Sequence, residues 1–213
     1  ANIKPIQVRH EASAVFMAMA YSRLKGSAGI VYASPGPGVA NMVPAMLEAY
    51  SSCLPIIAAC PSTSTKTEGM GAFQELDQVS LFKPVTKWSA RVLRPERIPW
   101  FMHRAFTLAL NGKPGPIFLD FPSDVVRSEV KEFPYKRSRK VLVRPDAELV
   151  KRAVELILSS ERPVVVAGGG AVLSRAFEEF RNFVEFFGIP FLTTPAGRGI
   201  LSEDHPLALG LVG

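Results

Sequence analysis

Cysteine is scarce in this sequence, which has only Cys53 and Cys60 among its 213 residues. Both lie in or beside apolar runs, where a free cysteine behaves as a small hydrophobic residue. Two such residues do not make the disulfide framework of a small secreted domain. We therefore expect free thiols and a reducing compartment, the cytoplasm.

Histidine is also rare, and its three positions are dispersed. None of His10, His103 and His205 has a second histidine or a cysteine at the spacing of a zinc site. We expect no metal site made by the side chains of this chain alone.

Long apolar runs are missing as well. No run approaches the roughly 20 residues of a membrane-spanning helix, and the first residues lack the basic and apolar regions of a signal peptide. We expect no membrane association, which again favours the cytoplasm.

Acidic residues are fewer than basic ones, since 19 Asp and Glu stand against 25 Lys and Arg, a formal net charge of +6. Much of the excess lies in residues 131–144, which contain the run KRSRK. No set of aromatic residues for base stacking accompanies it. We interpret this segment as a solvated linker and expect no nucleic-acid partner.

Apolar, β-branched runs alternate with helical periodicity over the first 125 residues. Strands that alternate with helices in this way are typical of a parallel sheet covered on both faces. The sequence therefore predicts an α/β fold with a doubly wound sheet. We expect strands at residues 29–33, 54–60, 86–92 and 117–121, and helices at residues 11–25, 39–52 and 99–110.

This periodicity vanishes between residues 123 and 145, where charges crowd together, and we expect a linker at residues 126–145. A second α/β pattern follows, with about two strands and a triple-glycine turn. A parallel sheet so small is hard to cover on both faces, which indicates a partial Rossmann-like domain. We expect helices at residues 146–159 and 175–187 and strands at residues 163–167 and 189–193.

One carboxylate stands at a predicted helix start. Glu11 opens the helix at residues 11–25, so its side chain lies at a helix N-terminus, where it is well placed to meet a ligand. The alternative is that Glu11 only complements the helix dipole. From this residue alone the alternative is the more frequent outcome.

A proline-glycine turn, residues 34–38, lies between a predicted strand and a predicted helix, the position of phosphate loops in doubly wound folds. Pro35 and Pro37 lack a backbone N–H, which removes two of the donors that a phosphate cradle uses. The turn therefore suits a flat ring better than an oxyanion. A tight strand-to-helix connection without a ligand stays open as the alternative.

Five motifs occur in register, and together they make a stronger signal than any one alone. They are RHE at residues 9–11, PGPG at 35–38 with Asn41, GAFQE at 71–75, GKPGP at 112–116 and LDFP at 119–122. In this order and spacing they resemble the thiamine diphosphate family of acetolactate synthases and their relatives, over the whole chain. The resemblance implies that residues 1–125 are the pyrimidine-binding domain without its N-terminal part. Residues 146–213 are then the first half of the central domain.

The resemblance also implies that a domain is missing. The family's diphosphate-binding domain holds Mg²⁺ through a Gly-Asp-Gly motif, and this sequence has no such motif. Asp120, Asp124 and Asp146 stand singly, and we expect them to be exposed or capping carboxylates. The chain is thus expected to be a fragment that is inactive alone, with thiamine diphosphate and Mg²⁺ bound through the missing domain.

By position, the resemblance implies roles for individual residues. Glu11 and Gln74 are the expected catalytic residues, and Glu11 hydrogen-bonds the aminopyrimidine ring and promotes its imino tautomer, which takes the proton from thiazolium C2. Phe73 and Gln74 lie on a loop that reaches an active site across a subunit interface. Without the resemblance, Phe73 would be interpreted as a core aromatic and Gln74 as a surface residue. The residues implied to contact the thiamine side are Pro37, Gly38, Asn41 and Phe73.

In the second unit, Gly168, Gly169 and Gly170 supply part of a dinucleotide fingerprint, in which Leu173 replaces the last glycine. The resemblance implies that this region binds FAD, as in acetolactate synthases, or ADP, as in acyl-CoA lyases, or nothing. Lys113 stands where FAD-dependent relatives often carry arginine, and lysine lacks the planar fork for bidentate phosphate contacts. We therefore expect a protein without tightly held flavin.

The resemblance implies a transferase or lyase that acts on 2-oxo acids and works as a homo-oligomer, a dimer or tetramer. Residues 69–75 resemble 2-hydroxyacyl-CoA and oxalyl-CoA lyases about as closely, so an acyl-CoA substrate is an alternative. A non-catalytic subunit or piece of such an enzyme is another, because the magnesium motif is missing. A nicotinamide-dependent dehydrogenase ranks last, because the glycine fingerprint is broken.

Overall fold

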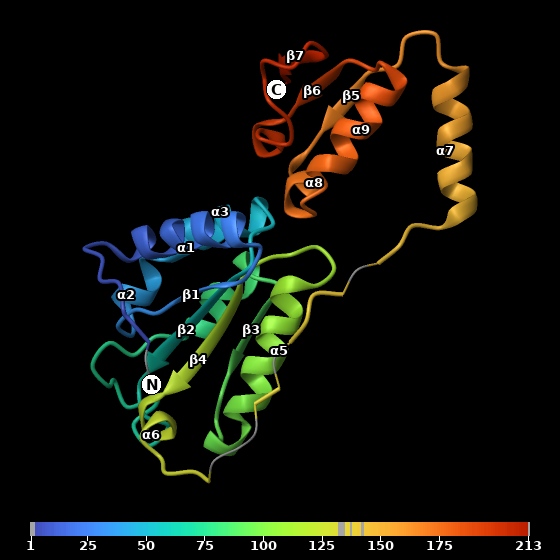
Figure 1. Cartoon of the computed structure of the whole chain (residues 1–213). Helices are drawn as coiled ribbons and strands as arrows, with labels where there is room; N and C mark the ends of the chain where they lie inside the picture. Colours follow the sequence, from blue (N-terminus) through green and yellow to red (C-terminus); the bar gives the residue numbers. More distant parts are fainter. Residues whose placement is uncertain (1–2, 132–134, 137, 142, 213) are drawn as a thin grey trace. The chain divides into compact units, whose positions relative to one another are not determined.

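The computed structural model describes residues 3–131, 135–136, 138–141 and 143–212. Contacts divide the chain into two compact units, Ala1–Val141 and Leu142–Gly213, and the division falls inside the expected linker (Figure 1).

Unit 1 is built on a four-stranded parallel sheet with the strand order β1-β2-β4-β3. The central strand β4 is paired on both sides, with Ile117 opposite Ile57 of β2 and opposite Trp88 of β3. All six residues of β4 are buried, as a parallel strand covered on both faces requires. The strands are β1 Gly29–Val31, β2 Ile56–Ser62, β3 Trp88–Arg91 and β4 Ile117–Pro122.

Helices cover both faces of this sheet (Figure 1). Ile117 and Leu119 pack with Ala105 and Ala109 of α5 on one face. Phe118 points to the other face, where its ring stacks on Phe82 at a centroid distance of 4.1 Å. The expected doubly wound α/β fold is confirmed. The helices of unit 1 are α1 Glu11–Lys25, α2 Pro37–Ala40, α3 Val43–Ser51, α4 Gln78–Phe82, α5 Ile98–Leu110 and α6 Ser123–Val126, with 3₁₀ turns η1 Lys83–Val85 and η2 Pro95–Arg97.

The helix expected at residues 39–52 is interrupted in the structure, because α2 ends at Ala40 and α3 begins at Val43. Pro44 has no N–H with which to continue the hydrogen-bond ladder back to Ala40. The break leaves α2 as a separate turn of helix that begins within the proline-glycine turn, beside Glu11.

Unit 2 has a three-stranded parallel sheet in the order β5-β6-β7, one strand more than the sequence led us to expect. The extra strand, β7, carries a glycine at positive φ, Gly210, which weakens its sequence pattern. Val184, Phe191 and Ile200 form the centre of the core of this unit. Its elements are α7 Ala147–Ser159, β5 Val165–Ala167, α8 Gly169–Leu173, α9 Phe177–Phe187, β6 Phe191–Thr193, η3 Pro195–Gly197 and β7 Ala208–Leu211.

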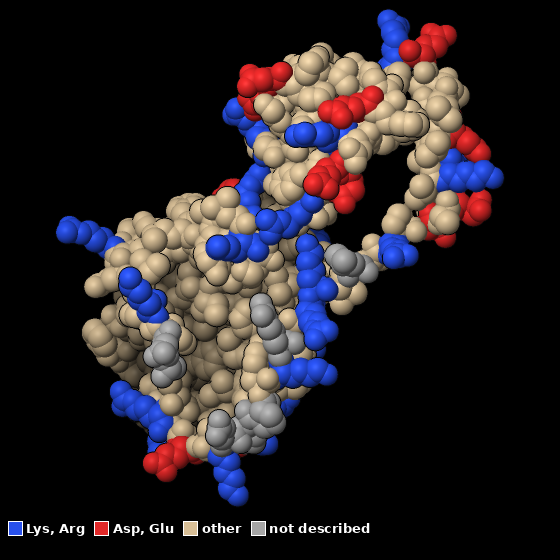
Figure 2. All heavy atoms as spheres, viewed as in Figure 1, with Lys and Arg blue, Asp and Glu red and all other residues tan. Residues whose placement is uncertain are grey.

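Charge is unevenly distributed over the surface. On the face shown in Figure 2, Lys and Arg dominate unit 1, whereas both signs are interspersed on unit 2. Within the residues that the structure describes, no helix has both the length and the apolar character needed to cross a membrane.

Candidate functional site

Glu11 is the first residue of α1, and its carboxylate faces α2. Oε2 accepts a hydrogen bond of 3.0 Å from Nδ2 of Asn41, the C-cap residue of α2. This hydrogen bond is the main reason why the pKa of Glu11 lies below its ordinary value. The carboxylate is therefore ionised at neutral pH and held in a fixed direction.

Gly38 lets the proline-glycine turn approach this carboxylate. A Cβ atom at Gly38 would lie 3.1 Å from Oε1 of Glu11 and 2.5 Å from Oγ of Ser34. A side chain at position 38 would therefore displace the hydroxyl of Ser34 and crowd the carboxylate of Glu11. The structure thus brings together Glu11, Gly38 and Asn41, three of the residues named from the sequence as a candidate site, and Pro37 stands exposed at the start of α2.

Gly36 holds the turn in a conformation that other residues rarely adopt, with φ 65° and ψ −110°. Its N–H donates to Oε1 of Gln78 over 2.9 Å. Because Pro35 and Pro37 have no N–H, the turn is poor in donors for an anion. One ionised carboxylate beside such a turn fits a ring that carries N–H groups or a protonated nitrogen, and it suits a diphosphate poorly.

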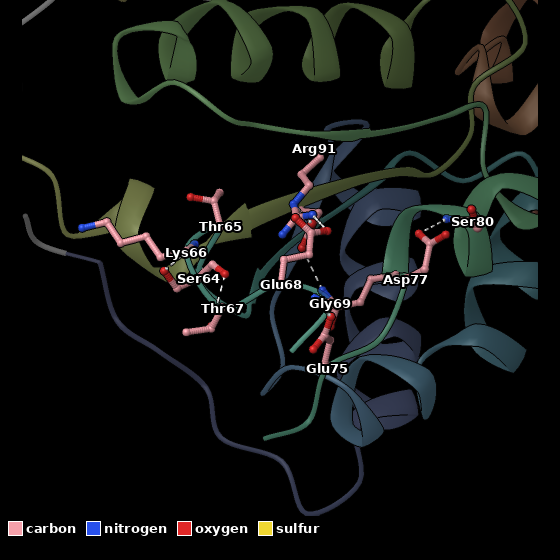
Figure 3. A network of polar contacts seen from close by, with 12 residues as sticks. Ser64, Thr65, Lys66, Thr67, Glu68, Gly69, Glu75, Asp77, Ser80 and Arg91 are labelled. Carbon is pink, nitrogen blue, oxygen red and sulfur yellow. Dashed lines mark hydrogen bonds and ion pairs between the residues drawn. The ribbon is translucent and has the colours of Figure 1, made fainter. Parts of the chain in front are cut away.

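The segment after β2, residues 63–77, lies on the same side of unit 1 as the proline-glycine turn. Polar contacts hold this segment in place (Figure 3). Asp124 accepts from the N–H and the hydroxyl of Thr65, at 3.0 and 2.6 Å. Arg91, at the end of β3, pairs with Glu68. These contacts fix the first half of the segment to the end of β3 and to α6.

Glu75 closes the second half of the segment on itself. Its two carboxylate oxygens accept from the N–H groups of Gly69 and Ala72, the latter over 2.9 Å. These backbone hydrogen bonds lower the pKa of Glu75, so the closing carboxylate is charged. Residues 69–75 therefore form a small closed loop, called here the Glu75 loop.

The Glu75 loop presents Phe73 and Gln74. The side chain of Phe73 is 87% exposed, so it is not the core aromatic that the residue alone would indicate. Gln74 has φ 60°, and its carbonyl oxygen would lie only 2.6 Å from a Cβ atom at Gly36. The structure thus brings the main chain of Gln74 against the proline-glycine turn, while the ring of Phe73 faces away from the core.

Asp120 corrects one expectation from the sequence. It is a buried residue, not an exposed or capping one, with 3% of its surface accessible. Oδ1 accepts from Nε2 of Gln78 over 2.9 Å, and Oδ2 lies 3.0 Å from Nε of Arg91. Burial raises the pKa of Asp120, and Ser62, Arg91 and Gln78 oppose that rise.

The sequence analysis missed Gln78, Arg91 and Asp120 as a group. One signal was present, because Asp120 is a charged residue inside an otherwise apolar strand, and a buried charge needs partners. The partners come from positions 29 and 42 residues away, which no local pattern reveals. Asp146, by contrast, caps α7 as expected.

In unit 2, the three glycines stand at the turn from β5 to α8. Gly168 is the N-cap of α8, and Gly169 packs so closely on Ala196 that a Cβ atom there would lie 2.9 Å from the Ala196 Cβ. Gly170 has open space at its Cβ position. Among the residues that the structure describes, no group of three or more His, Cys, Asp or Glu side chains is placed to hold a metal ion.

Comparison with known proteins gives two family matches. Residues 1–81 match the thiamine pyrophosphate enzyme N-terminal TPP binding domain, and residues 150–213 match the thiamine pyrophosphate enzyme central domain. The first match contains Glu11, the proline-glycine turn and the Glu75 loop.

Individual relatives agree with these matches. The chain is 41% identical to the "Probable acetolactate synthase large subunit" of Methanocaldococcus jannaschii, over 98% of this chain and 36% of that protein. It is 33% identical to acetolactate synthase isozyme 3 large subunit of Escherichia coli, over 100% of this chain and 38% of that protein. The chain thus spans little more than a third of the curated relatives that it matches.

A solved structure shares the fold. It is described as "a putative thiamin diphosphate-dependent enzyme isolated from Mycobacterium smegmatis", with 27% identity and a TM-score of 0.88. The match covers 96% of this chain and 40% of that one.

Proposed function

We propose that this chain, which belongs to the thiamine pyrophosphate enzyme family, supplies the pyrimidine-binding and central domains of an acetolactate synthase-like enzyme that acts on 2-oxo acids. The observation that carries the proposal is the Glu11 carboxylate, held by Asn41 beside a turn that lacks donors. The acetolactate synthase relatives favour this reaction over an acyl-CoA lyase.

When bound, thiamine diphosphate would supply an acidic thiazolium carbon and a ring that stabilises a carbanion on the atom bonded to that carbon. Glu11 would place its negative charge beside a pyrimidine nitrogen and favour the protonated form of that ring. Asn41 orients Glu11, and Pro37 and Gly38 provide the surface against which a flat ring lies. Gln74 and the exposed ring of Phe73 are the groups that the Glu75 loop offers to a substrate or to a neighbouring subunit.

The remaining assignments concern parts of the enzyme beyond this site. We place Mg²⁺ and the diphosphate on a further domain, because the chain spans little more than a third of its relatives.

The exposed loop with Phe73 supports a homo-oligomer, in which this loop is covered. Cys53 and Cys60 are both free thiols, which supports the cytoplasm. We propose as well that no flavin is held tightly, because Lys113 stands where FAD-dependent relatives often carry arginine, and lysine lacks the planar fork for a bidentate phosphate contact.

The test is Glu11→Gln in the complete enzyme, with Glu48→Gln, an exposed glutamate of α3, as the matched control. Glutamine keeps the shape and the hydrogen bond to Asn41 but removes the charge. We expect proton exchange at the thiazolium C2 of bound thiamine diphosphate, followed by NMR, to fall by about 10²–10⁴-fold, together with acetolactate formation from pyruvate. Exchange at the wild-type rate in Glu11→Gln would refute the assignment. Activity with an acyl-CoA and not with pyruvate would show that the substrate is an acyl-CoA and not a 2-oxo acid.

A further inference from the structure

We propose that Gln78 is a positioning residue for the cofactor, because it fixes the proline-glycine turn to the segment that carries the Glu75 loop. The inference rests on the proposed function, and it concerns a residue that neither contacts Glu11 nor belongs to any of the five motifs.

The acceptor end of Gln78 holds the turn at its centre. Gly36 stands between two prolines, so its N–H is the one amide proton of residues 35–37, and it donates to Oε1 of Gln78. Gly36 is buried, and its conformation leaves the main chain little freedom to find another partner. Without Gln78 this N–H would be buried and without a hydrogen-bond partner. Because a buried donor without a partner is destabilising, we expect the turn to move.

The donor end of Gln78 is also fully hydrogen-bonded. Its Nε2 donates to the carbonyl oxygen of Pro61 over 3.1 Å and to Oδ1 of Asp120 over 2.9 Å. The side chain is only 2% exposed, so water does not replace these partners. Since one end meets an N–H and the other a carboxylate and a carbonyl, the amide has one orientation that satisfies every partner.

A chain of polar contacts continues from Asp120 to the loop segment. Asp120 lies 3.0 Å from Nε of Arg91, and Arg91 also pairs with Glu68. Gln78 thus connects the turn to the anchors of residues 63–77 through the core of unit 1. The turn and this segment are held in one arrangement.

The position of the turn matters because Gly38, two residues after Gly36, lies against Glu11. A shift of Gly36 moves the surface against which the pyrimidine ring lies, while Glu11 stays at the start of α1. Small displacements of this kind have large effects on a positioned reaction.

The test compares Gln78→Leu with Thr86→Val in the complete enzyme. Thr86 is also buried, and its hydroxyl donates to the carbonyl of Phe82 over 2.8 Å at the end of α4, so its replacement removes one buried hydrogen bond near Gln78 without touching the turn. Three quantities are measured: exchange of the Gly36 amide proton by NMR without cofactor, the Kd for thiamine diphosphate by calorimetry, and C2 proton exchange at saturating cofactor.

For Gln78→Leu we expect faster exchange of the Gly36 amide, a higher Kd, and C2 exchange slower by about ten- to a hundredfold. We expect Thr86→Val to stay within about twofold of the wild type in all three quantities, even if its thermal stability falls as much as that of Gln78→Leu. C2 exchange in Gln78→Leu within twofold of the wild type would overturn the inference.

A second variant, Gln78→Glu, covers the case in which Gln78→Leu does not fold. Glutamate keeps the acceptor for Gly36 but sets a second carboxylate against Asp120, and this pair is satisfied only when it shares a proton. The C2 exchange rate relative to the wild type should therefore recover as the pH falls. A ratio that does not change with pH would contradict the role of Gln78. If the wild type itself neither binds the cofactor nor exchanges, the proposed function fails instead, and Gln78 with it.

Discussion

Asp120 and Asp124 stand four residues apart, yet their surroundings shift their pKa values in opposite directions. Asp120 is buried in β4, and burial raises its pKa. Asp124 lies one turn further, where the hydroxyl and the N–H of Thr65 donate to it and lower its pKa to about 2. Asp120 in β4 is therefore a carboxylate of the core, whereas Asp124 in α6 anchors a loop.

The low pKa of Asp124 predicts a pH-dependent contribution to stability. Because its folded pKa of about 2 lies below the ordinary value of 3.8, the contribution is present above pH 4 and is lost as the pH falls from about 4 to about 2. We expect Asp124→Asn to lower the free energy of unfolding by about 1 kcal/mol at pH 6 and to have little effect near pH 2. Urea unfolding at both pH values measures this, with Asp204→Asn, an exposed aspartate of unit 2, as the control. An equal loss at both pH values would show that charge is not the cause.

At the scale of elements, the end of α5 holds the chain that leaves unit 1. Asn111 follows the last residue of α5, and its Nδ2 donates to the carbonyls of Thr107 and Arg139, at 2.9 and 3.2 Å. Its Oδ1 accepts from the N–H of Val141 over 2.6 Å. One side chain therefore both completes the helix end and fixes residues 139–141 along it.

Asn111→Ala should release these residues. Losing two side-chain hydrogen bonds to the segment costs about 1–2 kcal/mol locally, which corresponds to about a 5- to 30-fold larger open population. We expect tryptic cleavage after Arg139 and Lys140 to accelerate by this factor, as followed by mass spectrometry. Asn182→Ala, at an exposed position of α9, should leave the cleavage rate unchanged. Unchanged cleavage in Asn111→Ala would mean that other contacts hold the segment.

The sequence predicted those elements well whose ends are set by local chemistry. The helix expected at residues 11–25 is α1, which starts after the capping side chain of His10 and ends at Gly26 in the left-handed conformation. The five-residue α4 was not predicted, because it is held by tertiary contacts and is too short to show a period.

The candidate site likewise has a part that the local sequence indicates and a part that it does not. Glu11, Gly38 and Asn41 could be named from the sequence because they belong to motifs on adjacent elements. The contact of Gln78 with Gly36 spans 42 residues, so nothing in the local sequence of either residue indicates it. The family resemblance stated from the motifs is confirmed by the matches to the two thiamine pyrophosphate enzyme domains.

At the scale of the molecule, the proposed function assigns this chain one side of a cofactor site. In that proposal Glu11 and the turn face the ring of the cofactor, and the described residues bring together no cluster of acidic side chains for a metal ion. A cofactor whose charge lies in its diphosphate gains only a small part of its binding free energy from such a surface.

We therefore expect the 213 residues alone to bind thiamine diphosphate weakly, with a Kd of roughly 1 mM or above, and to form no acetolactate. Calorimetric titration with thiamine diphosphate and Mg²⁺, beside a pyruvate consumption assay, measures both, and the complete enzyme is the positive control. Tight, magnesium-dependent binding with turnover would show that the diphosphate site lies within these residues.

The closed Glu75 loop has an entropic consequence for whatever surface comes to cover Phe73. The loop is already shaped by the backbone hydrogen bonds that Glu75 accepts from Gly69 and Ala72, so its main chain loses little further freedom when the aromatic ring is buried. Ordering one mobile side chain on association typically costs about 0.5–1.5 kcal/mol, and ordering a loose loop costs more. The main chain beneath Phe73 is thus preorganised, so a surface that covers the ring would have to order only the side chain, and not the loop.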